Sequence, residues 1–216
     1  GNRAFDSDAI EATFCMPMEP LKSEVAKDFE RYTFEEYDGR GSYVAGADWA
    51  KEQDYTVIAV MRTDVSPARL VSWTRVNRRP YPTMVGYFNE EIDKYDAEAI
   101  HDSTGLGNVV SDYLDIRARG FTMTGEKRDA MLSEYVSAVE QGRFSFPKIL
   151  TAYTAHKYAQ VGDLYSRQQQ YHLPDEVCAL ALCNRLISRS APAAPIVGIR
   201  KDDAPNKFAA VLDRPK

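Results

Sequence analysis

The order of its apolar segments constrains the fold of this chain more than any other feature of the sequence. Three runs rich in β-branched and apolar residues follow one another with short polar connections, at 42–50, 55–63 and 69–76. Runs of this kind predict strands, and short connections join consecutive strands into an antiparallel meander. After residue 76, segments with helical apolar spacing alternate with short apolar runs. The sequence therefore predicts an α/β domain in which a three-strand meander is followed by parallel strands, with helices flanking the mixed sheet.

The predicted elements divide the chain into three parts. Expected helices cover 81–95, 107–120, 127–142, 149–167 and 175–188, and further short strands cover 97–103, 121–125 and 144–147. We expect 1–40 to be an irregular lead-in with one helical turn near 23–32, 41–188 to be the folded domain, and 189–216 to be a flexible tail.

Composition sets broad limits on function. The chain has 216 residues, enough to bury a full core, and no run approaches the roughly 20 apolar residues that a membrane span needs. Its N-terminus lacks the pattern of a signal peptide, so we expect a cytoplasmic protein without a membrane partner. Cys178 and Cys183 lie in an apolar run and are predicted to be buried thiols in a reducing compartment. The net charge of −5 weighs against a domain that grips DNA alone.

Three aspartates stand at the ends of apolar elements. Asp48 and Asp102 end predicted strands, and Asp175 opens a predicted helix. Such positions converge in an open sheet, because sites form at the carboxyl ends of strands. Clustered carboxylates repel one another unless a cation neutralises them, and oxygen ligands favour Mg²⁺ or Mn²⁺. Two such ions about 3.5–4 Å apart can activate water and stabilise the leaving oxygen of a phosphodiester.

Each aspartate also has a purely structural interpretation. Asp48 could be a turn residue at a strand end, and Asp102 could stabilise a turn through its own backbone. Asp175 follows a proline and suits a helix N-cap. The occurrence of all three, each on its own apolar element, favours a shared metal site.

Three segments carry a resemblance to a known family. YVAGADWAKEQDYTVIAVMR at 43–62, IHDSTGLGNVVSDYL at 100–114 and HLPDEVCALAL at 172–182 resemble the nuclease domain of the large terminase subunit of tailed bacteriophages. In that family a strand ends in Gly-x-Asp and a second acid follows six residues later, as Asp48 and Asp54 do here. The third family motif is an Asp-Asp pair before a helix, whereas Pro174 precedes Asp175 in this chain.

The resemblance implies a ribonuclease H-like fold and an endonuclease that cleaves double-stranded DNA during viral genome packaging. It implies Asp48, Asp102 and Asp175 as catalytic metal ligands, with Asp48 bridging two ions of Mg²⁺ or Mn²⁺. Asp54 would be a supporting carboxylate, and Glu176 could replace the ligand that is lost at Pro174.

The resemblance also implies partners. Large terminases carry an ATPase motor, so 1–40 would be the remains of the connection to it, and the portal protein and small terminase subunit would be partners at the procapsid in the host cytoplasm. Basic residues that could contact phosphate lie in a turn and at the start of a predicted helix. They are Arg75, Arg78 and Arg79 in the turn, and Lys127 and Arg128 at the helix start.

Two alternatives remain open. A Holliday-junction resolvase or transposase-like nuclease of the same fold would use a similar acidic site. A non-catalytic portal-docking module would need the aspartates only as turn and cap residues.

Overall fold

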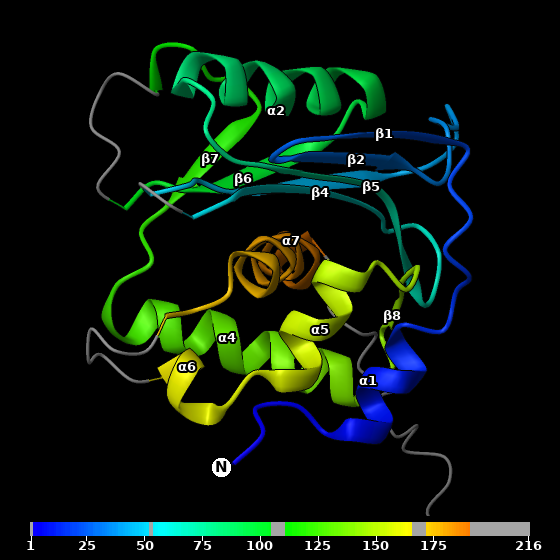
Figure 1. The fold of residues 1–216 in the computed structure, drawn as a ribbon, viewed down its shortest axis with the longest axis vertical. Coiled ribbons are helices and arrows are strands. Elements are labelled where there is room, and N and C mark those ends of the chain that lie inside the picture. Colours follow the sequence, from blue (N-terminus) through cyan, green and yellow to red (C-terminus); the bar gives the residue numbers. More distant parts are fainter. Residues whose placement is uncertain (1, 52–53, 105–110, 166–171, 191–216) are drawn as a thin grey trace, which may run out of the picture.

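A mixed β-sheet with helices on both faces forms the frame of the computed structural model, which describes residues 2–51, 54–104, 111–165 and 172–190 (Figure 1). The strands are β1 (Lys22–Ala26), β2 (Phe29–Thr33), β3 (Tyr43–Asp48), β4 (Thr56–Arg62), β5 (Ala68–Val76), β6 (Glu98–Asp102), β7 (Ala118–Phe121) and β8 (Phe144–Ser145). They form an eight-stranded sheet in the order β1-β2-β5-β4-β3-β6-β7, with β8 beside β5.

The central strands have the predicted directions. β3, β4 and β5 are an antiparallel meander, β6 runs parallel to β3, and β7 runs parallel to β6. The prediction of a meander followed by parallel strands is therefore confirmed. The carboxyl ends of β3, β6 and β7 consequently lie at the same edge of the sheet.

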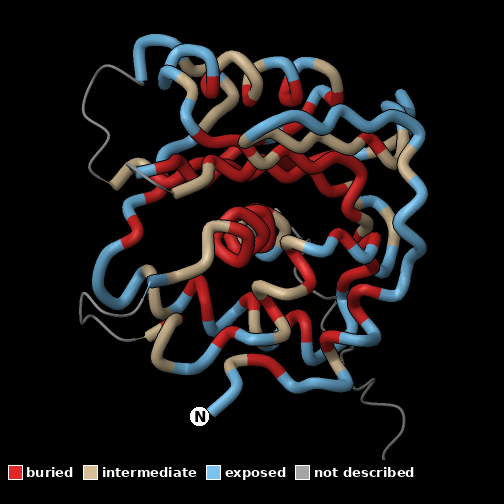
Figure 2. The backbone as a smooth tube through the Cα atoms, in the orientation of Figure 1, coloured by how far each residue is buried: buried red, intermediate tan, exposed pale blue. Residues whose placement is uncertain are grey.

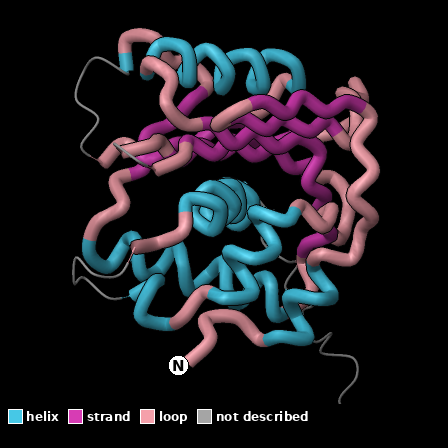
Figure 3. The backbone as a smooth tube through the Cα atoms, in the orientation of Figure 1, coloured by secondary structure: helices cyan, strands magenta, loops and turns pink. Residues whose placement is uncertain are grey.

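Helices cover the sheet unequally. The described helices are α1 (Ser7–Thr13), α2 (Tyr81–Tyr95), α4 (Gly125–Glu140), α5 (Leu150–Tyr158), α6 (Val161–Tyr165) and α7 (Asp175–Ser190). α2 lies on one face of the sheet, whereas α7 lies on the other, with α4, α5, α6 and α1 forming a further layer beneath it (Figures 1 and 3). None of the described helices combines the length and apolarity that a membrane crossing requires.

The core sits on both sides of the sheet, and α7 is its most enclosed helix. One buried cluster packs α2 against the sheet, and a larger one packs α7, α4 and α5 against the opposite face (Figure 2). Cys178 and Cys183 on α7 are buried free thiols, as predicted.

Close packing of α7 against the sheet depends on one glycine. A Cβ atom at Gly46 of β3 would lie 2.7 Å from the carbonyl oxygen of Ala179 and 2.8 Å from Sγ of Cys183. Only a residue without a side chain lets helix and strand approach this closely. This crossing brings the first turn of α7 to the carboxyl end of β3.

The prediction for the first 40 residues was wrong in its local structure. Instead of a helical turn near 23–32, β1 and β2 form an antiparallel hairpin, and β2 extends the sheet alongside β5. Pairing with the free edge of β5 outweighs a weak local helical preference, because strand formation depends on tertiary partners. Upstream, Asp6 caps α1 by accepting a hydrogen bond from the amide of Ala9 at 2.9 Å.

Two predicted boundaries in the second half were also wrong. The predicted helix over 107–120 and strand over 121–125 overlook β7, which pairs with β6 from Ala118 to Phe121; residues 105–110 lie outside the described part. The predicted helix over 149–167 is interrupted between α5 and α6, where the extended backbone of Ala159 accepts a hydrogen bond from the amide of Ala4. Residues 166–171 are also outside the described part, as is most of the predicted tail, although α7 continues to Ser190.

Candidate metal-binding active site

Asp48 and Asp102 end neighbouring parallel strands on the same face of the sheet. Ala47 and His101 are paired in register between β3 and β6, so the two aspartates follow side by side. Side chains alternate between the faces of a strand. Val44 and Ile100 belong to the core on the α7 side; Asp48 and Asp102, an even number of residues later, therefore face α7. Both aspartates are only 8% exposed.

Asp175 reaches the same place from the other direction. It lies in the first turn of α7, and its Oδ2 accepts a hydrogen bond of 3.0 Å from the amide of Tyr55, just before β4. The carbonyl of Pro174 accepts the amide hydrogens of Val177 and Cys178 at the helix start. The carboxylate of Asp175 thus points toward the sheet. The carbonyl of Pro174, and not the side chain of Asp175, accepts the first hydrogen bonds of the helix.

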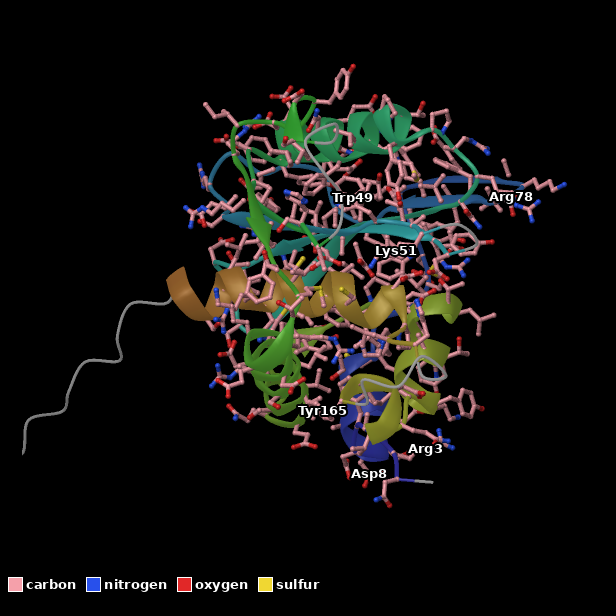
Figure 4. The ribbon with its side chains drawn as sticks, turned by 90° about the vertical axis from the view of Figure 1, so that its left-hand side faces the viewer. Arg3, Asp8, Trp49, Lys51, Arg78 and Tyr165 are labelled. Carbon is pink, nitrogen blue, oxygen red and sulfur yellow. The ribbon has the colours of Figure 1, made fainter. Side chains whose placement is uncertain are left out.

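The three aspartates line one pocket of about 130 Å³ between the sheet and the start of α7. Its walls come from the ends of β3 and β6 with the residues that follow them, the turn before β4, the start of α4 with the segment before it, and the start of α7 with the segment before it. The lining residues are Asp48, Trp49, Lys51, Asp54, Asp102, Thr104, Met123, Arg128, His172, Leu173, Asp175 and Cys178. Trp49 and Lys51 are labelled in Figure 4, which views the molecule from this side.

Burial and neighbouring acids raise the pKa values of two of the carboxylates. Burial raises the pKa of Asp48 well above its usual value, and the charges of Asp175 and Asp102 raise it further. Burial also raises the pKa of Asp175 to about 6, although the hydrogen bond from the Tyr55 amide works in the opposite direction. Burial and neighbouring carboxylates thus disfavour the charged forms of both residues, and a bound cation would relieve this. The oxygen donors fit a hard divalent ion.

Neighbouring residues hold the carboxylates in place. The amide of Thr104 donates a hydrogen bond of 2.8 Å to Oδ1 of Asp102, so the predicted turn role of Asp102 is present together with its place in the pocket. Cys178, which lines the pocket beside Asp48, donates a thiol hydrogen bond of 3.2 Å to Sδ of Met123. Behind the site, the indole of Trp49 donates to Nδ1 of His101 at 3.0 Å.

Comparisons with known proteins find similar chains among large terminase subunits. No family model matches the chain. The curated large terminase subunit of Thermus virus P23-45 is 25% identical over 122 residues, which are 54% of this chain and 25% of that protein; the match thus spans about a quarter of the relative. The solved large terminase nuclease from thermophilic phage G20c with bound magnesium has a TM-score of 0.67 at 22% identity, covering 85% of this chain and 97% of that chain. The large terminase nuclease domain of Thermus phage P74-26 has a TM-score of 0.65 at 21% identity, covering 84% and 94%.

The fold is that of a large terminase nuclease domain. The predicted ribonuclease H-like mixed sheet is therefore confirmed, and the structural similarity covers 85% of this chain. The G20c nuclease was also solved with bound cobalt and with bound zinc.

Within this terminase-like fold, Glu176 and Arg75 are engaged with each other. Nε of Arg75 lies 2.8 Å from Oε1 of Glu176, and the guanidinium stacks over the ring of Tyr55 at 3.5 Å. Neither residue is among those that line the pocket. The roles predicted for them, as supporting carboxylate and phosphate contact, stay predictions, and their ion pair braces the start of α7 against β5.

The other basic candidates are dispersed over the terminase-like fold. Arg78 is exposed and lies at the periphery of the molecule in Figure 4, and the guanidinium of Arg79 reaches the backbone carbonyl of Asn77 at 3.5 Å. Lys127 is exposed in the first turn of α4. Of the five, Arg128 lines the pocket, where its guanidinium donates to the carbonyl of Leu164.

The sequence interpretation missed several pocket residues that have distinctive chemistry. Lys51 and His172 lie in irregular connections, where no periodic pattern marks a side chain as inward-facing. Cys178 was identified as buried but was not connected to the site. Its spacing of three residues from Asp175 was the available signal, since residues three apart share one face of a helix.

Proposed function

We propose that this chain is the nuclease domain of a large terminase and that it cleaves double-stranded DNA during viral genome packaging. The observation that carries the proposal is the convergence of Asp48, Asp102 and Asp175 on one pocket from three separate elements. The similarity to nuclease domains solved with magnesium, cobalt and zinc supports it. The proposed reaction is hydrolysis of a phosphodiester bond by an endodeoxyribonuclease.

The three aspartates would hold the metal, which we propose to be two ions of Mg²⁺ or Mn²⁺. Bound divalent ions supply Lewis-acid chemistry and lower the pKa of coordinated water at neutral pH. Asp48 would suit a position shared by two ions, because it follows the strand beside Asp102 and lines the same pocket as Asp175. The hydrogen bond from Thr104 orients Asp102. Asp54, at the rim of the same pocket, would contribute a supporting carboxylate.

Two positively charged side chains at the pocket suit a phosphate-bearing substrate. Lys51 and Arg128 line it from opposite elements, the turn after β3 and the first turns of α4. A scissile phosphate in the pocket would meet the positive charges of these two side chains next to the acidic cluster. Because phosphate contacts carry no sequence information, we expect cleavage with little sequence preference.

The remaining electrostatic grip on DNA would come from partners. The chain carries a net charge of −5, whereas domains that bind DNA alone are usually basic. We propose that an ATPase motor in the full-length protein, the portal protein and the small terminase subunit hold the DNA at the procapsid in the host cytoplasm.

A plasmid-nicking assay tests the proposal. Supercoiled plasmid is incubated with the protein in Mg²⁺, Mn²⁺ or chelator, and Asp48→Asn is compared with Asp8→Asn. Asp8 is exposed on α1 and lies at the bottom of the molecule in Figure 4, whereas Lys51 lies near its middle. We expect metal-dependent nicking by wild type and Asp8→Asn, and loss of nicking in Asp48→Asn.

Three outcomes would count against the proposal. Nicking that persists in chelator would remove the role of the metal. Cleavage restricted to branched DNA would favour a Holliday-junction resolvase. Absence of both metal binding and cleavage would favour a non-catalytic docking module.

A further inference from the structure

The imidazole of His172 lies next to the acidic site, on its solvent-exposed side. Asp54, His172 and Asp175 each present a ligand atom, and these atoms all lie within 4.8 Å of one another. Nε2 of His172 lies 3.2 Å from Oδ2 of Asp54. The three residues come from the turn before β4, the segment leading to α7 and the first turn of α7. They therefore meet only in the folded protein.

This trio differs chemically from the inner carboxylates. Asp48, Asp102 and Asp175 offer oxygen alone, which suits Mg²⁺ and Mn²⁺. A trio with one imidazole nitrogen suits borderline ions such as Co²⁺ and Zn²⁺ better. Imidazole nitrogen binds these ions more strongly than it binds Mg²⁺. Asp175 belongs to both sets and so connects the outer position to the inner one.

Exposure is graded across the trio. The side chain of His172 is 64% exposed and that of Asp54 is 33% exposed, while Asp175 is partly buried beside the Tyr55 amide. A cation arriving from solvent would meet the imidazole first and the shared carboxylate last. An isolated exposed pair of histidine and aspartate contributes little to stability, so fold stability alone gives little reason for the imidazole to be at the mouth of the pocket.

We propose that His172 is a metal ligand which, with Asp54 and Asp175, forms an outer cation position and biases the site toward Co²⁺, Zn²⁺ and similar ions over Mg²⁺. This inference rests on the proposed function, because it assumes that the inner carboxylates bind metal. It adds a residue that determines metal preference.

Metal affinities measured by calorimetry on the full chain test the inference. We expect His172→Ala to weaken binding of Co²⁺ and Zn²⁺ by about tenfold or more while changing Mg²⁺ affinity by less than about threefold. His172→Gln separates two roles, since its amide can still donate a hydrogen bond to Asp54 but lacks the imidazole nitrogen. Leu173→Ala is the matched control, because Leu173 lines the same pocket without a metal donor.

Nitrogen NMR of the histidine rings gives a readout that does not depend on activity. The chain has three histidines, so the signal of His172 is assigned by its absence in His172→Ala. On addition of Zn²⁺, we expect the Nε2 resonance of His172 to shift and one tautomer to be fixed. His156, hydrogen-bonded to Tyr135 in the core, serves as the internal reference.

The outcomes distinguish this inference from the proposed function. If wild type binds Mg²⁺ and cleaves DNA but His172→Ala keeps full Co²⁺ and Zn²⁺ affinity, the inference is wrong and the proposed function stands. If His172→Gln retains wild-type Co²⁺ affinity, His172 only orients Asp54 and is not a ligand. If wild type binds none of the ions, the proposed function fails first.

Discussion

Neutralising one carboxylate of the cluster should stabilise the metal-free protein. In Asp175→Asn the side chain keeps its shape and can still accept the hydrogen bond from the Tyr55 amide, but it carries no charge. Burial and neighbouring acids make the charged form of Asp175 unfavourable. The substitution removes that unfavourable charge, so we expect a higher free energy of unfolding at neutral pH in the absence of metal.

The size of the effect follows from the pKa. Folding raises the pKa of Asp175 from 3.8 to about 6, and each unit corresponds to about 1.4 kcal/mol. Ionisation of Asp175 therefore lowers the stability of the folded state by up to about 3 kcal/mol. The sign follows from proton binding: between pH 3.8 and about 6 the folded state holds the proton and the unfolded state has released it. Stability of the wild type consequently falls as pH rises through this window.

Urea denaturation in chelator at several pH values measures this. Above about pH 6, Asp175→Asn should be more stable than wild type by up to about 3 kcal/mol, and its advantage should shrink as the pH is lowered toward 4. Asp8→Asn, at an exposed position on α1, should show no comparable pH-dependent gain. Saturating Mg²⁺ should stabilise the wild type more than Asp175→Asn. A variant that is destabilised equally at pH 8 and pH 4 would refute the reasoning, because it would mean that Asp175 is not held in a repulsive cluster.

Three further predictions concern the supports of the site. Gly46→Ala should lower the free energy of unfolding by about 1–3 kcal/mol in urea denaturation, because its Cβ would meet Ala179 and Cys183; unchanged stability would contradict the close crossing of α7 and β3. Arg75→Ala should cost about 1–3 kcal/mol by leaving the buried Glu176 unpaired, and a double-mutant cycle with Glu176→Gln should show that the two effects are not additive. Removing metal with chelator should lower the melting temperature measured in Mg²⁺, with full recovery on re-addition; a melting temperature that ignores metal would argue against a bound ion.

The elements that were predicted well from the sequence are those whose own residues show a clear apolar pattern. The apolar and β-branched runs of β3, β4 and β5 and the apolar spacing of α2 predict strand or helix without reference to a distant partner. β1 and β2 were missed because Lys22–Ala26 is wholly exposed and Phe29–Thr33 is mostly half-buried, so neither has a clear apolar face. Their structure comes from tertiary pairing, of β2 with β5 and of β1 with β2. β7, a short segment with the sequence ARGF, likewise depends on β6.

The candidate site likewise contains residues that local sequence can place and residues that depend on tertiary packing. Asp48 and Asp102 could be placed together from the sequence, because acids at the carboxyl ends of parallel strands reach one edge of a sheet. The position of Asp175 depends on how closely α7 packs on Gly46, and the sequence does not reveal that packing. Lys51 and His172 enter the pocket from irregular connections, and only the structure shows where these point.

The proposed function requires Asp48, Asp102 and Asp175 to share bound cations. Anomalous scattering from crystals of the protein grown with Mn²⁺ would test this most directly, because it locates the ion independently of any assay. We predict an anomalous peak within about 2.0–2.4 Å of oxygens from all three aspartates, and loss of that peak in Asp48→Asn. Manganese bound at another surface, or a pocket that stays without anomalous density at millimolar Mn²⁺, would contradict the account.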